Sequence, residues 1–201
     1  MSLDDFLPFG LLIGFIAVGL FVQSRLRRRS RRAWEEAAAE LGLQFECEEG
    51  GAKPRLRGEL NGLSVSAYEL EVRTQKSRSI VTRAEVLVPG LPADLRVARS
   101  DWTQLVQDAL GIREVEVGDP EFDKRFRILG REDVARAVLD ADARRSIDDL
   151  ARGGTAWIAE GKVLVQLQGS VLRSHPFIER VRQLVFCAAA VSSACRSSPR
   201  K

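Results

Sequence analysis

The chain has 201 residues, a formal net charge of +3 at neutral pH and three cysteines. This length allows one domain with a buried core beside short terminal segments. The charge would suit a nucleic-acid binder, but nine of the 31 basic residues lie in the Arg-rich stretch 25–32 and the tail 196–201. Residues 33–195 then hold 22 basic and 26 acidic side chains. Because a domain of that sign does not attract phosphate backbones, nucleic acid is disfavoured as a partner.

Residues 6–22 form an apolar run that no charged residue interrupts. A helix of this length covers most of a hydrocarbon core about 30 Å thick, so the run predicts a transmembrane helix. A cleaved secretory signal would carry its positive charge before the run, whereas here Asp4 and Asp5 precede it. Six arginines follow the run: Arg25, Arg27, Arg28, Arg29, Arg31 and Arg32.

This distribution of charge predicts a single-pass protein with residues 1–5 outside the cell and everything after residue 22 in the cytoplasm. The preference for Arg over Lys is typical of a GC-rich bacterial genome, so we expect a bacterial inner (cell) membrane. There the six arginines would contact anionic lipid headgroups. Gly10 and Gly14 match the helix-dimerisation spacing, so homodimerisation through them is an alternative to a separate protein partner.

Residues 23–42 are expected to continue the helix as a basic flank and helical stalk, with Gly42 as its stop. Alternating apolar and polar residues over 43–99 predict an antiparallel meander. Within it, Asn61-Gly62 predicts a tight hairpin, and residues 89–92 break the strand before them.

The second half of the chain predicts helices and strands in alternation. We expect a helix over 101–110, a short strand at 115–117 and another at 125–129, helices within 131–152, and a hairpin from 155–158 to 163–167. The final helix opens at residue 174, and its fully apolar stretch 185–191 predicts enclosure by other elements. The fold class is therefore α+β, with a cytoplasmic domain over 43–195, a mostly antiparallel sheet, a buried C-terminal helix and a polar tail at 196–201.

Few residues in the chain are suited to catalysis. His175 is the only histidine and stands beside Pro176 at a helix start, where a structural role is favoured. Cys47, Cys187 and Cys195 lack metal-ligand spacing and are interpreted as small apolar residues in a reducing compartment. No glycine-rich phosphate loop is present, so the sequence predicts no cofactor.

Asp119, Glu121 and Asp123 are the densest acidic set in a predicted loop. Such carboxylates could bind a hard cation or act as general acid and base. A calcium loop counted from Asp119 needs Gly at its sixth and Glu at its twelfth position, and the chain has Lys124 and Gly130 there. The favoured interpretation is a tight turn capped by Asp119, and the cation or enzyme site is the alternative.

The segment Gly-Asp-Pro-Glu-Phe-Asp-Lys-Arg-Phe at 118–126, with the helices and hairpin after it, resembles an uncharacterised family of bacterial membrane-anchored proteins. That family has a Gly-Asp-Pro-x-Phe-Asp-x-x-Phe stretch in a cytoplasmic domain, and the resemblance implies no catalytic residue. The order of the elements is also similar to that of tubby-like barrels, which hints at contact with lipid.

Together these features predict a membrane-anchored interaction or scaffold domain without an evident catalytic site. The first alternative is a lipid-binding or lipid-handling domain at the inner membrane surface. The second is an enzyme that uses Asp119, Glu121 or Asp123.

Overall fold

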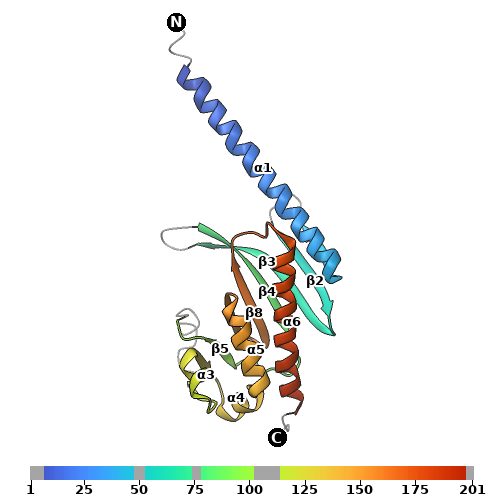
Figure 1. Cartoon of the computed structure of the whole chain (residues 1–201), viewed down its shortest axis with the longest axis vertical. Helices are drawn as coiled ribbons and strands as arrows, with labels where there is room; N and C mark the ends of the chain where they lie inside the picture. The colour runs from blue at the N-terminus through green and yellow to red at the C-terminus, as the bar shows by residue number, and fades with distance from the viewer. Residues whose placement is uncertain (1–6, 48–52, 74–77, 102–113, 198–201) are drawn as a thin grey trace.

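A computed structural model describes residues 7–47, 53–73, 78–101 and 114–197, and within α1 it describes side chains from Val18 onward. The chain folds into one long N-terminal helix and an α+β domain (Figure 1). The elements are α1 (Leu7–Leu41), β1 (Gln44–Cys47), β2 (Pro54–Leu60), β3 (Leu63–Arg73), β4 (Arg78–Leu87), β5 (Arg96–Arg99), α3 (Pro120–Arg125), β6 (Phe126–Leu129), α4 (Glu132–Val138), α5 (Ala141–Arg152), β7 (Thr155–Ala159), β8 (Lys162–Gln168) and α6 (Ser174–Ser197).

The strands form one eight-stranded antiparallel sheet in the order β1-β2-β3-β4-β8-β7-β5-β6. This arrangement confirms the predicted α+β class and the mostly antiparallel sheet. The predicted meander over 43–99 is wrong at its end, because β8 and β7 separate β4 from β5. β4 forms seven residue pairs with β8, whereas β5 has only four residues with which it could pair along the same edge of β4. The longer pairing forms more ladder hydrogen bonds.

Two hairpins of the sheet turn on residue pairs with positive φ. Asn61 and Gly62 have φ of 54° and 74°, and Glu160 and Gly161 have φ of 54° and 73°. These angles are those of type I′ turns, whose twist matches that of the strands they join. Both predicted hairpins are therefore confirmed.

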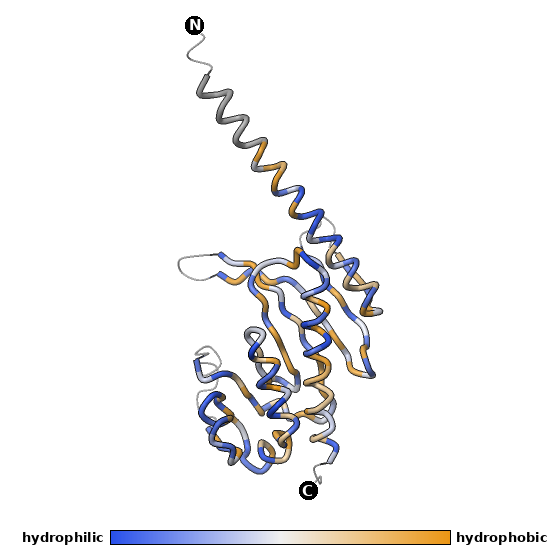
Figure 2. Tube along the Cα trace, viewed as in Figure 1, coloured by the Kyte–Doolittle hydropathy of each residue, from blue (hydrophilic) through white to orange (hydrophobic). Residues whose placement is uncertain are grey.

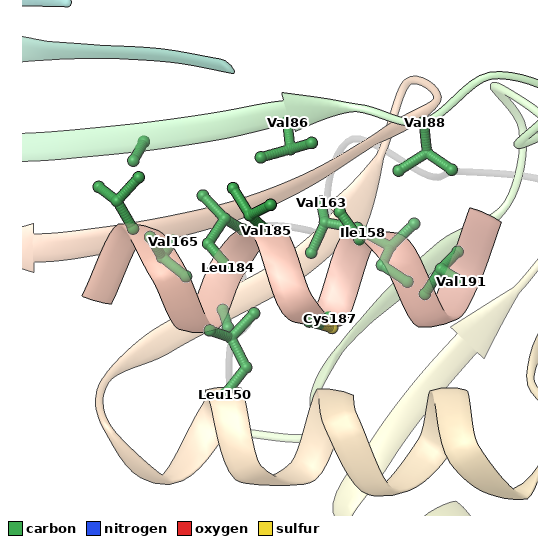
Figure 3. Close-up of a cluster of buried hydrophobic side chains, with 14 of the residues drawn as sticks. Val86, Val88, Leu150, Ile158, Val163, Val165, Leu184, Val185, Cys187 and Val191 are labelled. Atoms are coloured by element: carbon green, nitrogen blue, oxygen red, sulfur yellow. The ribbon is translucent and has the colours of Figure 1, made fainter. Parts of the chain in front are cut away.

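The core lies between the sheet and the helices on one of its faces. Figure 3 shows α6 lying against the sheet, with Leu184 and Val185 on the side of Val86 and Val163, and Val191 further along the helix. All five side chains are buried, which confirms the predicted burial of the C-terminal helix. The expectation that residues 185–191 are enclosed on every side is wrong at Phe186, which is 71% exposed.

The last turns of α1 belong to this core. Ala33, Trp34, Ala37, Ala38 and Leu41 are buried, so the second half of the predicted stalk is part of the domain. The helix ends where predicted, because Gly42 has a φ of +67° and the Leu43 amide donates to the Ala38 carbonyl over 2.9 Å.

Trp34 fixes this end of α1 against α6 and the sheet. Its ring is fully buried, with its centroid 5.0 Å from that of Phe177, and its Nε1 donates to Glu69 Oε1 over 3.3 Å. Around it, Ser174 Oγ hydrogen-bonds Glu36 over 2.8 Å, and Arg182 pairs with Glu40 over 3.0 Å. Because α1 and α6 run in the same general direction, these contacts form one seam along both helices (Figure 1).

Figure 2 shows that α1 changes from apolar to strongly polar residues before it reaches the domain. Among the residues the structure describes, no helix is long and apolar enough to cross a membrane. Of the predicted transmembrane segment 6–22, Phe6 and the side chains of 7–17 lie outside the described residues. The predicted helix over 101–110 also lies outside them, apart from its first residue. At the predicted strand 115–117 only an isolated bridge from Glu114 to Leu129 forms.

Replacing Trp34 with alanine is expected to lower the free energy of unfolding by about 3–5 kcal/mol, because the change leaves a cavity between α1 and α6. Urea denaturation followed by circular dichroism measures this loss. Glu35→Gln removes only an exposed pair with Arg31 and should change stability by less than about 1 kcal/mol. A loss of that small size for Trp34→Ala would show that α1 is not part of the cooperative core.

Candidate functional site

Asp119 and Asp123 of the 118–126 segment accept hydrogen bonds from backbone amides of their own turn. Asp119 Oδ1 accepts from the Phe122 amide over 3.2 Å and so caps α3. Asp123 accepts from the amides of Val117, Gly118 and Asp119 over 3.0–3.2 Å. The turn predicted from sequence is confirmed.

Asp119 also pairs with Arg144 over 3.0 Å. The Phe122 amide and the Arg144 guanidinium lower the pKa of Asp119, which keeps it ionised as a cap. Glu121 is exposed on the outer side of this turn. Among the described residues, no group of three His, Cys, Asp or Glu side chains could hold a metal ion. The hydrogen bonds of Asp119 and Asp123 give these carboxylates a structural role.

Asp148 joins this turn to α5. It accepts from Arg125 of α3 and, over 2.7 Å, from Arg152 one turn further along α5. Its partial burial alone would raise the pKa of the carboxyl, but the two arginines outweigh this effect and lower the pKa.

His175 is exposed at the start of α6, and the cysteines differ in burial. Cys187 is fully buried in the core, and this desolvation raises its pKa to about 12. Because only the thiolate is a strong nucleophile, Cys187 is chemically inert in the folded domain. Cys47 and Cys195 are partly exposed.

Arg180 is the one strongly charged side chain buried in α6 among the described residues, at 5% exposure. It donates to the Leu150 carbonyl at the end of α5, to Gln183 over 3.1 Å, and lies against Gly153, where a Cβ would be 2.4 Å from Nη1. A cation is favourable at a helix C-terminus, so Arg180 ties α6 to α5.

A second polar network lies on the face of the sheet opposite the helices. Glu85 accepts from Lys162 over 3.0 Å and from Tyr68 over 3.2 Å. Beside it, the Arg83 guanidinium lies 5.1 Å from the centre of the Trp157 ring. Burial and the Glu85 charge raise the pKa of Tyr68, which therefore stays a neutral donor. These contacts join strands β3, β4 and β8 on this face of the sheet.

A groove of about 650 Å³ lies where α1 meets the end of the sheet, and we call it the α1 groove. Its walls come from α1, from β1, β2, β3 and β4, and from the segment after β8. The lining residues are Gln23, Leu26, Arg27, Arg28, Ser30, Arg31, Phe45, Cys47, Pro54, Glu69, Ile80, Ser170 and Leu172.

Exposed apolar side chains gather in the α1 groove. Leu26, Ile80 and Leu172 are 46%, 48% and 40% exposed and come from three separate segments. Apart from the end of the apolar run at 18–22, only Leu87 and Phe186 are comparably exposed large hydrophobic residues in the described chain. Such a convergence marks a binding surface more often than scattered single residues do.

The six arginines predicted to contact lipid divide into two sets. Arg27, Arg28 and Arg31 line the α1 groove, whereas Arg25, Arg29 and Arg32 do not. Arg31 pairs with Glu35 over 2.7 Å. Arg27 and Arg28 form no ion pair with any residue that the structure describes. Sequence reasoning found the arginines but missed Ile80 and Leu172, which are distant in the chain.

A second groove, of about 720 Å³, lies beside Phe186, and we call it the α6 groove. Its apolar floor comes from the end of α1, the tip of the β2–β3 hairpin, α5 and α6. The lining residues are Glu40, Leu41, Leu60, Asn61, Ser146, Asp149, Leu150, Arg182, Gln183, Val185, Phe186 and Ala189. No sequence signal marked it, because its members lie in four separate elements.

No protein-family model, curated protein or solved structure matches this chain. The resemblances drawn from the 118–126 segment and from the order of the elements therefore stay predictions, and the grooves must be interpreted from their own chemistry.

The charge of Asp148 should contribute to stability mainly at neutral pH. Its folded-state pKa is lowered, so the contribution is complete above about pH 5 and is lost as pH falls through that pKa. Asp148→Asn is expected to cost about 1 kcal/mol of unfolding free energy at pH 7 and less at pH 3. Urea titrations at both values measure the difference. Asp149→Asn, at an exposed neighbouring carboxylate, is the control, and an equal pH dependence in both variants would contradict the assignment.

Proposed function

We propose that this protein is a single-pass membrane protein whose cytoplasmic domain is a non-enzymatic interaction module. Residues 6–22 cross the membrane, residues 1–5 lie outside, and the domain lies at the cytoplasmic surface. The observation that carries the proposal is the continuity of α1, which runs unbroken from the apolar segment into the core. A spanning helix of this kind would orient the domain as well as retain it at the membrane.

The charge pattern supports this topology. The apolar run lacks charged residues, and the six arginines follow it within about three turns of helix. Positive residues flanking a span on one side favour the cytoplasm for that side. Trp34, two residues after the last of these arginines, is buried in the domain and so attaches the domain to α1 next to them.

The α6 groove supports an interaction role. Its floor is apolar, Phe186 stands beside it largely in solvent, and Glu40 and Asp149 lie at its rim. Arg182 is neutralised by pairs with Glu40 and Glu179 over 3.0 and 2.8 Å. This chemistry fits an amphipathic helix of a protein partner that carries an apolar face and a basic flank.

Ile13→Arg is expected to remove the chain from membranes, because a charge at the centre of a span costs about 2.5–3.5 kcal/mol of insertion free energy. Alkaline carbonate extraction of cell membranes measures the retained fraction. Gln23→Arg adds the same charge beyond the apolar run and should leave the chain in the membrane pellet. Extraction of the unchanged chain by carbonate would contradict the tether.

Phe186→Asp is expected to weaken partner binding about thirtyfold or more, since a buried aromatic anchor contributes at least about 2 kcal/mol. A photo-crosslinking residue at Ala189 reports the contact in membranes. The proposal requires an adduct that depends on Phe186 and maps to an amphipathic, basic helix in the partner. Leu87→Asp changes a residue of similar size that is 49% exposed outside both grooves, and it should keep the adduct.

Two outcomes would contradict this assignment. An adduct of two copies of this chain would make the groove a homodimer interface, a different contact from the predicted pairing through Gly10 and Gly14. An adduct that forms equally well with and without Phe186→Asp would exclude the α6 groove as the binding surface.

A further inference from the structure

We infer that the α1 groove binds one anionic phospholipid, with its phosphate on Arg27 and Arg28 and part of an acyl chain over Leu26, Ile80 and Leu172. The inference deepens the proposed function and rests on it for the source of the lipid, the bilayer that residues 6–22 would cross. It adds a defined lipid site to a helix that otherwise serves as a tether.

The first argument is the position of the groove along α1. Gln23 and Leu26 follow the end of the apolar run at Val22 by one and four residues, which is about 6 Å of helix rise at most. The headgroup layer on each side of a bilayer is about 5–8 Å thick. The end of the groove at Gln23 and Leu26 would therefore lie in the headgroup layer when residues 6–22 cross the bilayer.

The second argument is the combination of chemistry in one concave site. The arginines lie on the α1 side, and the exposed apolar side chains Ile80 and Leu172 lie on the domain side. A phospholipid has this same division, with a phosphate that accepts hydrogen bonds from guanidinium groups and chains that need apolar contact. A soluble anion would use the arginines and leave the apolar wall in water.

The third argument is the state of the groups around the groove. Arg27 and Arg28 lack an ion-pair partner among the described residues, whereas Arg31 is held by Glu35. The carboxylate in the groove, Glu69, is half-buried and accepts from Trp34. Burial raises the pKa of Glu69 and disfavours its negative charge. The two free guanidinium groups therefore give the rim its positive character.

Cys47 provides a native reporter, because it lines the groove and is partly exposed. The full-length chain in a non-ionic detergent is titrated with phosphatidylglycerol, and maleimide modification of Cys47 is followed by peptide mass spectrometry. The peptide map separates Cys47 from Cys187 and Cys195. Phosphatidylglycerol is expected to slow the modification, and phosphatidylcholine to do so much less.

Matched double variants separate the groove from general charge attraction. Arg27→Gln with Arg28→Gln should raise the half-protecting concentration of phosphatidylglycerol about thirtyfold, because each substitution removes a charge-assisted hydrogen bond to the lipid phosphate. Arg25→Gln with Arg29→Gln removes the same charge from the same helix outside the groove, so only the general attraction to anionic lipid is weakened and that concentration should change much less. Leu172→Gln should weaken protection without changing the charge.

Three results would each overturn the inference. The two double variants would lose protection of Cys47 equally, phosphatidylcholine would protect Cys47 as well as phosphatidylglycerol does, or inorganic phosphate would protect it equally. Carbonate extraction of the same chain tests the tether separately. A chain extracted by carbonate that still shows arginine-dependent protection would retain the lipid site and reject the span. A carbonate-resistant chain without lipid protection would retain the tether and reject the site.

Discussion

The burial of Trp34 between α6 and the sheet is the contact on which the rest of the structure depends. Through this contact the last turns of α1 become part of the hydrophobic core. The polar contacts of Ser174 and Arg182 with α1 lie beside it. Without this contact, α1 would be a flexible connection and neither groove would have its α1 wall. The proposed tether, joined in this way, would transmit orientation, because a tilt of α1 would tilt the sheet with it.

The two grooves lie at opposite ends of the α1–α6 seam. The α1 groove begins beside residue 23, near where the helix leaves the domain, and the α6 groove lies around Leu41 and Phe186. The first combines arginines with an apolar wall, and the second combines an apolar floor with carboxylates. This separation would let one end of the seam contact lipid while the other remains open to a protein.

Local patterns in the sequence predicted much of the fold. Asn61-Gly62 gave its hairpin, Gly42 its helix stop and Asp119 its cap, because each depends on a few neighbouring residues. The strand order could not be predicted in the same way, since β4 pairs with β8 across some 80 residues. The grooves were hidden for the same reason: Leu26, Ile80 and Leu172 meet only after the sheet has formed.

The seam between α1 and α6 also has a consequence for how the chain is made. Trp34 leaves the ribosome early, whereas Phe177, which packs against it, is synthesised after all eight strands of the sheet. The buried face of α1 must therefore stay without its final neighbour during most of translation. A domain closed by such distant contacts folds late and slowly. The apolar face around Trp34 would stay exposed to solvent until α6 is complete.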